Sequence, residues 1–324
     1  MLVVHRTALR RRLLTQHGCR VPKPRRHFAS RASLWQASKD PRLDDIGHIL
    51  EDNFLVMRDK YEVPKHAIIL AHGLLGFDKL HLAGQSIAYW YGITEALAAK
   101  GVEVITAEVP PSGRIEVRAE KLARVIEEKA GGKAVNIIAH SMVGLDARHM
   151  LSRIHPPNVK VLSLTTVATP HRGSAFADYI FNLIGTSNVP KLYRALEFFG
   201  LETGAFRQLT ENYMLEHFNP RTPDVDSVRY FSFGATFQPQ LTSVFRRSHR
   251  IVQQAEGPND GLVSVSSSQW GTYKGTLQNV SHLDLINWTN KLRWYLFSMT
   301  GQKRKFNAIA FYLSIADMLA KEGL

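Results

Sequence analysis

Short apolar runs alternate with helical patterns over much of the chain, and this alternation is the feature that most restricts its fold. The runs at 67–71, 102–106, 134–139 and 159–169 are rich in Val, Ile and Ala, as buried strands are. Helical patterns of about 10–18 residues separate them. Strands joined in this way form a mostly parallel sheet with helices on both faces. The sequence therefore predicts an α/β protein with its functional residues at the carboxyl ends of the strands.

The second part of the chain is less regular. Residues 173–222 interrupt the alternation with amphipathic helix patterns, and strand signals return at 228–235 and 249–252. Residues 306–320 carry an apolar stripe at helical spacing, which indicates a helix packed on the core. We therefore expect one α/β domain over residues 65–324 that contains the insertion.

The net charge of +13 is concentrated at the amino terminus. Residues 1–39 hold ten Lys and Arg and no Asp or Glu, whereas residues 40–324 hold 31 basic and 28 acidic side chains. The body is therefore nearly neutral, which argues against an extended nucleic-acid surface. An Arg-rich, acid-free leader is typical of a mitochondrial transit peptide. We interpret 1–28 as a presequence cleaved after Phe28, and 29–64 as an amino-terminal extension.

A disordered basic arm that binds acidic partners is the alternative interpretation of this leader. The one cysteine of the chain, Cys19, lies inside it, so a processed protein would have no thiol for a disulfide, a metal site or a nucleophile. No apolar stretch approaches the ~20 residues of a membrane span. We expect a mitochondrial protein that is soluble or peripheral to a membrane and that has no nucleic-acid partner.

One serine stands where a strand pattern gives way to a helix pattern. The segment AHSMVG (139–144) places Ser141 on a tight strand-to-helix turn, which projects the hydroxyl out of the sheet. This hydroxyl is not ionised at neutral pH, so a nucleophilic serine needs a base, and the base needs a group that orients it. Without such partners, Ser141 is only a helix cap.

Two further side chains supply the missing groups. Asp260 lies in the Gly-containing loop GPNDGLV, which we place after the strand at 249–252, and His282 follows the strand-like segment GTLQNV. Each has a simpler explanation, because Asp260 suits a turn and His282 suits a cap or the core. The order Ser141, Asp260, His282 is that of the nucleophile-elbow hydrolases, however, and the three together indicate a catalytic triad.

A tetrahedral intermediate at Ser141 needs two N–H donors. The segment AHGLLGFD (71–78) follows the first clear strand, and its glycines let the backbone approach a ligand closely. We assign the donors to the backbone N–H groups of Leu74 and Met142. His72 and Asp78 are expected to shape the loop.

Five motifs stand in a fixed order over residues 65–290, namely HGLLGFD, AHSMVGLDAR, ATPHRGSAFADY, NDGLV and SHLDLIN. They resemble the motifs of lipases with the α/β-hydrolase fold. They are most similar to those of fungal mitochondrial triacylglycerol lipases, which are related to the Pseudomonas and Burkholderia enzymes. The resemblance implies a serine carboxylic-ester hydrolase that acts on acylglycerols or other lipid esters, needs no cofactor, and works at a membrane or lipid-droplet surface.

The resemblance makes the insertion at about 173–222 a helical lid. Its apolar stripe would cover the site in water and turn toward lipid at an interface. The candidates for lipid contact are Phe176, Tyr179, Ile180, Phe198 and Phe199. Packing in an ordinary helical core explains the same stripe, and both interpretations stay open.

Two departures from the family pattern bear on activity. The pattern G-x-S-x-G has Val143 at its last position, and a β-branched side chain there should strain the crowded elbow or displace the helix, although Gly144 follows. The bacterial relatives bind calcium near the histidine loop, where Asp284 matches one ligand position. Because the sequence offers no second carboxylate, we assign no metal, and Asp284 alternatively braces the loop.

The same parts could serve a phospholipase, a thioesterase or an acyltransferase of this fold. Val143 also keeps open a non-catalytic protein of the hydrolase fold that binds lipid or a partner. The hydrolase interpretation depends on Ser141, Asp260 and His282 meeting at one edge of the sheet.

Overall fold

The computed structural model describes residues 49–50, 54, 57–72, 79–82, 85–110, 113–186, 207–241, 243–287 and 306–324. These residues belong to one compact unit of the chain, Pro41–Leu324. The proposed presequence, residues 1–28, and most of the proposed extension, residues 29–64, lie outside the described residues.

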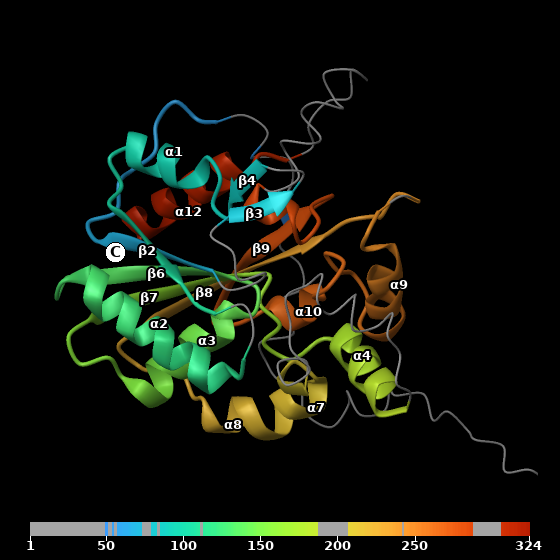
Figure 1. The fold of residues 1–324 in the computed structure, drawn as a ribbon. Helices are drawn as coiled ribbons and strands as arrows, with labels where there is room; N and C mark the ends of the chain where they lie inside the picture. The colour runs from blue at the N-terminus through green and yellow to red at the C-terminus, as the bar shows by residue number, and fades with distance from the viewer. Residues whose placement is uncertain are drawn as a thin grey trace, which may run out of the picture. The chain divides into compact units, whose positions relative to one another are not determined.

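The central sheet of the described part has seven strands in the order β1-β9-β8-β7-β6-β2-β5 (Figure 1). The strands are β1 (Ile49–Leu50), β2 (Ala67–His72), β5 (Val104–Glu108), β6 (Ala134–His140), β7 (Lys160–Val167), β8 (Arg229–Thr236) and β9 (Thr272–Gln278). Every pairing in this sheet is parallel. The carboxyl ends of the strands therefore share one edge. A separate antiparallel pair consists of β3 (Lys79–Leu82) and β4 (Gln85–Ala88).

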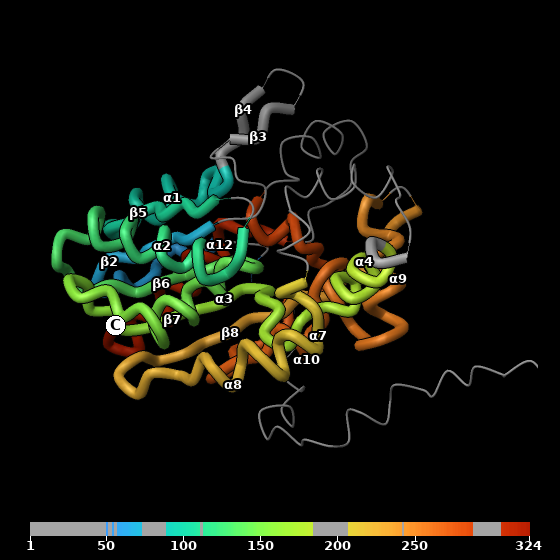
Figure 2. The backbone as a smooth tube through the Cα atoms, turned by 60° about the horizontal axis from the view of Figure 1, so that its bottom comes forward, coloured from blue at the N-terminus to red at the C-terminus, as the bar shows by residue number. Residues whose placement is uncertain are grey.

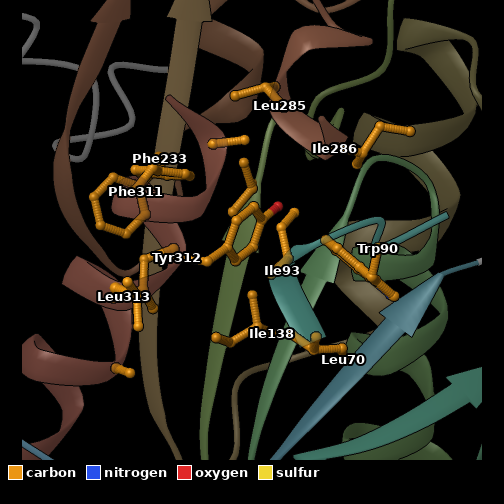
Figure 3. Packing of buried hydrophobic residues seen from close by; sticks show 14 of the residues in the cluster. Leu70, Trp90, Ile93, Ile138, Phe233, Leu285, Ile286, Phe311, Tyr312 and Leu313 are labelled. Atoms are coloured by element: carbon orange, nitrogen blue, oxygen red, sulfur yellow. The ribbon is translucent and has the colours of Figure 1, made fainter. Parts of the chain in front are cut away.

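One face of the sheet is covered by α1 (Ile93–Ala99) and α12 (Ala308–Lys321) (Figure 1). Leu70 of β2 points to this face, because side chains alternate between the two faces along a strand. Figure 3 shows the aromatic centre of this layer, where the rings of Trp90 and Tyr312 meet edge to face with centroids 5.2 Å apart. The stripe predicted for the carboxyl-terminal helix is thus core packing.

The opposite face carries α2 (Ile115–Ala130) and α3 (Val143–His149) (Figure 1). Ile69 of β2 and Ile137 of β6, which are paired in the sheet, point to this side and join the apolar cluster under the two helices. α3 continues as a π-helical turn, Met150–Ile154. Because α3 begins where β6 ends, its first turn lies at the edge where we expect the chemistry.

The remaining helices follow β7, β8 and β9 along the chain. They are α4 (Ala175–Thr186), α7 (Glu211–Tyr213) with the π-helical turn Met214–Phe218 and α8 (Asn219–Arg221), α9 (Arg246–Ala255), α10 (Val265–Ser268) and the 3₁₀ turn Asp284–Ile286. Figures 1 and 2 both show α4 and α9 side by side, and the two helices are in contact.

The predicted α/β class is confirmed, but the strand predicted at 249–252 is wrong. These residues lie within α9, where Ser248, His249 and Val252 are buried at helical spacing. Two adjacent apolar residues do not distinguish a strand from one buried stripe of a short helix. In the part of the chain that the structure describes, no helix has the length and apolar character needed to cross a bilayer.

Candidate active site

Ser141 occupies a tight turn between β6 and α3, with φ of 62° in the left-handed region. This conformation costs a residue other than glycine about 1–3 kcal/mol. Three hydrogen bonds hold it. The Ser141 N–H donates to the carbonyl of Val167 (2.9 Å), and the Ser141 carbonyl accepts from Thr169 Oγ1 (2.7 Å) and from the N–H of Gly144 (3.1 Å). The elbow is therefore fixed by β7 and the segment that follows it.

The steric crowding that the sequence predicts at Val143 is found at Gly144 instead. Val143 begins α3, and its side chain is completely buried in the cluster beneath that helix, so it extends the core without displacing the helix. Gly144, the next residue of α3, faces Thr166 and Thr169. A Cβ atom on Gly144 would lie 2.8 Å from Thr169 Cγ2 and 3.0 Å from Thr166 Cγ2, and closer still to Thr169 Oγ1. Glycine is thus required at 144 by close approach.

The three side chains singled out in the sequence are in contact. His282 Nε2 lies 2.9 Å from Ser141 Oγ, and His282 Nδ1 lies 2.7 Å from Asp260 Oδ2. Asp260 and His282 have no exposed surface, and Ser141 is 6% exposed. An ionised carboxylate only accepts hydrogen bonds, so Nδ1 carries the proton and Nε2 is free to accept from the serine hydroxyl.

Asp260 is held by its own loop. Its second oxygen, Oδ1, accepts hydrogen bonds from the N–H groups of Leu262 (3.0 Å) and Val263 (2.9 Å). Its backbone carbonyl accepts from the N–H of His282 (2.9 Å). The carboxylate therefore has fixed partners on one oxygen and presents the other to the imidazole, and the two loops are joined by their backbones.

The Asp260 loop follows α9 and not a strand, which corrects the position given by the sequence. It reaches the sheet edge because Phe237, directly after β8, donates its N–H to the carbonyl of Asn259 (3.2 Å). The loop is thereby attached to the carboxyl end of β8, which explains how Asp260 meets side chains from other strands.

A second imidazole lies against His282, and sequence reasoning did not anticipate it. The His140 ring centroid is 4.6 Å from that of His282, and Tyr89 Oη lies 2.8 Å from His140 Nδ1. Burial lowers the pKa of His140 well below its usual range, and His282 lowers it further. Burial also raises the pKa of the Tyr89 hydroxyl, which stays protonated and donates to His140. An uncharged ring thus packs on His282 and restricts its movement.

The motif ATPHRGSAFADY organises the site without supplying a reacting group. Thr169 braces the elbow carbonyl, and Arg172 donates to the carbonyls of Ser266 (2.8 Å) and Gln269 (2.7 Å) around α10. Sequence reasoning used this motif only for the resemblance. The motif combines small residues with hydroxyl-bearing and cationic side chains directly after a strand. That composition could have indicated a segment that holds the site through hydrogen bonds.

Of the two N–H groups assigned to the oxyanion, one can be placed. Met142 lies at the start of α3, where backbone N–H groups have no partner inside the helix. Leu74 lies outside the described residues, as do Asp78, Phe198 and Phe199. His72, at the end of β2, is buried and its ring stacks on Tyr89 with centroids 4.6 Å apart, which fits its expected structural role.

The candidate lid residues of α4 pack on the elbow helix. Ile180 is 4% exposed and joins an apolar cluster with Met142 and Leu145, and Phe176 and Tyr179 are partly buried against the same cluster. This arrangement is the core packing that the sequence left open, formed directly over the first turn of α3.

The side chain of Asp284, the calcium candidate of the sequence, is hydrogen-bonded within its own turn. Asp284 Oδ2 accepts hydrogen bonds from the N–H (3.0 Å) and the hydroxyl (2.6 Å) of Ser281, so it braces the turn beside His282. Among the described residues, no group of three or more His, Cys, Asp or Glu side chains is arranged to hold a metal ion.

Glu256 joins the Asp260 loop to α4. Its carboxylate accepts hydrogen bonds from the N–H of Ala175, the first residue of α4, and from the hydroxyl of Ser264. Burial, with a smaller contribution from the carboxylates of Glu211 and Asp178, raises the pKa of Glu256 to about 7. Ser174 makes a parallel link by donating its hydroxyl to the carbonyl of Leu262 (2.6 Å).

A parallel sheet covered by helices, with a serine on a strand-to-helix turn in contact with a His–Asp pair, defines a serine hydrolase of the α/β-hydrolase fold. No family model matches the chain. Triacylglycerol lipase 2 of Saccharomyces cerevisiae is 39% identical over 313 residues, which cover 82% of this chain and 94% of the yeast protein. A Vibrio cholerae triacylglycerol lipase is 29% identical, over 70% of this chain and 81% of its own length. The chain therefore belongs to the triacylglycerol lipase family.

Solved structures agree on the fold. The lipase of Staphylococcus hyicus superimposes with a TM-score of 0.57 at 20% identity and covers 82% of this chain and 98% of its own. A metagenomic carboxyl esterase superimposes with a TM-score of 0.60 at 18% identity and covers 84% of each chain. The predicted membership of the triacylglycerol lipases and the predicted enzyme class, a lipase or carboxylesterase, are confirmed.

Gly144→Ala is expected to lower turnover by about 10²-fold, because the new methyl group displaces Thr169 and with it the carbonyl of Ser141. Hydrolysis of a soluble short-chain ester measures the loss, and thermal unfolding shows whether the fold is kept. The matched variant Val143→Gly should lower the free energy of unfolding by about 2–4 kcal/mol through lost packing, without raising the rate. A gain in rate would show instead that Val143 strains the elbow.

Glu256→Gln is expected to flatten the pH dependence of stability. The pKa of Glu256 in the folded protein is about 7, above the ordinary value of 4.5. Its contribution to stability is therefore fully present below pH 4.5 and is lost as the pH rises through 7. The uncharged variant should gain about 2 kcal/mol on the wild type between pH ~5 and pH ~8 in urea unfolding. Glu128→Gln, at an exposed position on α2, is the control, and parallel pH profiles for all three proteins would contradict the assignment.

Proposed function

We propose that this chain hydrolyses triacylglycerols, with Ser141 as the nucleophile, His282 as the general base and Asp260 as the carboxylate that orients His282. The observation that carries the proposal is the unbroken hydrogen-bonded series from Asp260 Oδ2 through the imidazole to Ser141 Oγ. Membership of the triacylglycerol lipase family supports the substrate class.

The reaction follows from this arrangement. Ser141 Oγ attacks the acyl carbonyl while His282 Nε2 takes the hydroxyl proton, and the protonated imidazole then gives that proton to the departing glycerol oxygen. Water, deprotonated by His282, attacks the acyl-enzyme and releases the fatty acid. Asp260 keeps the proton of the neutral ring on Nδ1 and stabilises the imidazolium form.

The oxyanion of each tetrahedral intermediate accepts hydrogen bonds from the backbone N–H groups of Met142 and Leu74. Met142 supports this role, since its N–H lies in the first turn of α3, directly after the nucleophile. Preorganised donors of this kind act where charge develops and need no rearrangement during the reaction.

The insertion at about 173–222 acts as a lid in this proposal. α4 packs Ile180 against Leu145 and against Met142, which directly follows Ser141 in the chain, and the reacting side chains are buried. A bulky acylglycerol reaches Ser141 only when part of this cover moves, and a lipid surface stabilises the apolar side chains that the movement exposes. The working site is thus the surface of a membrane or a lipid droplet.

The basic leader directs the protein to mitochondria in this proposal. Its ten Lys and Arg without a carboxylate support an import signal. The body of the enzyme, residues 65–324, would act after residues 1–28 are removed.

Ser141→Ala is expected to lower ester hydrolysis by about 10⁴–10⁶-fold, because no other group replaces the nucleophile. Release of fatty acid from emulsified triolein measures the effect, and a fluorophosphonate probe should label the wild type but not the variant. Ser152→Ala, on the π-helical continuation of α3, is the matched control and should keep both properties. A Ser141→Ala protein that retains more than about a tenth of the activity would refute the nucleophile.

The full chain is expected to lose residues 1–28 on import, so that the mature protein begins at Ala29. Incubation with isolated mitochondria followed by amino-terminal sequencing of the protected product tests this. A chain with Arg10, Arg11 and Arg12 changed to Ala should remain outside and unprocessed. Recovery of the unaltered wild-type chain outside the organelle would contradict the proposal.

A further inference from the structure

We propose that α9 and the segment before it dock onto the surface of a bilayer that contains anionic phospholipid. The docking face, as defined here, consists of Leu241, Val244, Arg246, Arg247 and Arg250. The inference rests on the proposed function, since it concerns where the enzyme meets its substrate, and it goes further by naming the headgroup charge and the side chains that recognise it.

The charge of this face is one-sided. Residues 227–255 contain four Arg and no Asp or Glu. On α9 itself, Arg246, Arg247 and Arg250 are all exposed, while Ser248 and Val252 of the same helix are buried. The helix therefore presents its cations to solvent without a carboxylate of its own to neutralise them, as a surface for anionic headgroups requires.

The apolar part of the face is unusually open. Leu241 is 79% exposed and Val244 is 65% exposed, the two highest values among the large apolar side chains that the structure describes. They lie immediately before the arginines in the chain. Apolar side chains beside basic ones are the composition with which interfacial helices enter the boundary between headgroups and acyl chains.

The described acidic groups on α4 and directly after α9 are engaged elsewhere. Asp178 of α4 accepts a hydrogen bond from the N–H of Glu211 (3.2 Å), and Glu256 is bound to Ala175 and Ser264. α4 contacts the docking face through Tyr179, whose Oη accepts a hydrogen bond from Arg247 Nη2 (2.6 Å). The neighbouring helix thus adds an interfacial aromatic residue to the face.

The position of the face fits delivery of substrate. α9 lies beside α4, the proposed lid, in Figures 1 and 2. A bilayer that contacts α9 therefore also lies next to the helix that must move. A nucleic acid would use the arginines but gains nothing from Leu241 and Val244, and the nearly neutral body offers no continuation of the charge. The face favours lipid.

The experiment places an environment-sensitive dye on the face of the full chain. Cys19 is the one cysteine and is changed to Ser, and Val244→Cys then gives a single site for an NBD label. The matched control is Val117→Cys on α2, which is 58% exposed. Figure 1 shows the helices α2 and α9 apart from one another. Because each dye senses only its own surroundings, binding through the basic residues 1–39 does not produce the signal.

Vesicles of phosphatidylcholine with about one-third phosphatidylglycerol should raise the emission at position 244 several-fold and shift it to the blue, and should leave position 117 unchanged. Adding Arg246→Gln and Arg250→Gln should abolish most of the rise, since each arginine contributes about fivefold to binding near an anionic surface. An unchanged signal at 244, equal signals at both positions, or an equal rise with pure phosphatidylcholine or with duplex DNA would each overturn the proposal.

Hydrolysis is measured separately, with the wild type and the Arg246→Gln/Arg250→Gln variant on a soluble short-chain ester. Both should be equally active, because neither arginine touches the reacting groups. If neither protein hydrolyses esters but the dye still reports arginine-dependent insertion, the docking face stands and the proposed function fails. If hydrolysis is normal and the dye reports nothing, the proposed function stands and the docking face fails.

Discussion

The site depends on a hydrogen bond that extends the parallel sheet by one residue, from the N–H of Ser141 to the carbonyl of Val167. The chain leaves β6 at Ser141, which has a left-handed conformation. The chain leaves the neighbouring strand β7 in the same way at Ala168 (φ 49°), whose N–H donates to the carbonyl of Phe233 in β8 (2.9 Å). Each left-handed residue is fixed by the next strand in the sheet. The strain at Ser141 is therefore held by strand pairing, and the sheet must be complete before the Ser141 hydroxyl is in place.

Burial makes the electrostatics of the site strong, and it also makes an unmatched charge costly. In the proposed reaction, proton transfer from Ser141 places a positive charge on the His282 imidazole, which has no exposed surface. Asp260 compensates that charge from 2.7 Å, and it is an effective partner because its other oxygen is bound to two backbone N–H groups. His140 packs on the same ring but is kept uncharged by burial, so it positions His282 without opposing its charge.

The sequence predicts the parts of this arrangement that have a local signature. Apolar runs locate the strands of the sheet, and the strand-to-helix turn locates Ser141, since both depend on neighbours in the chain. The sequence-based predictions were wrong where packing between residues distant in the chain determines the structure. The helical residues 249–252 resemble a strand when considered alone, and the constraint expected at Val143 lies at Gly144 because Thr169, distant in sequence, closes on the elbow. His140 and Tyr89 were missed because nothing near either residue indicates that their side chains meet.

The charge of the chain illustrates the same limit. A nearly neutral body excludes a broad phosphate-binding surface, but a net value averages over the whole surface and conceals the acid-free stretch at 227–255. The fold connects this stretch to the site, because α9 ends directly before Glu256. The Glu256 carboxylate accepts hydrogen bonds from the start of α4 and from the hydroxyl of Ser264 in the Asp260 loop. The basic helix, the proposed lid and the loop of the triad carboxylate thus share one hydrogen-bonded junction. Moving α4 away from the elbow must break one of these bonds, and a Glu256 carboxylate that titrates near neutral pH makes the cost of that movement depend on its protonation.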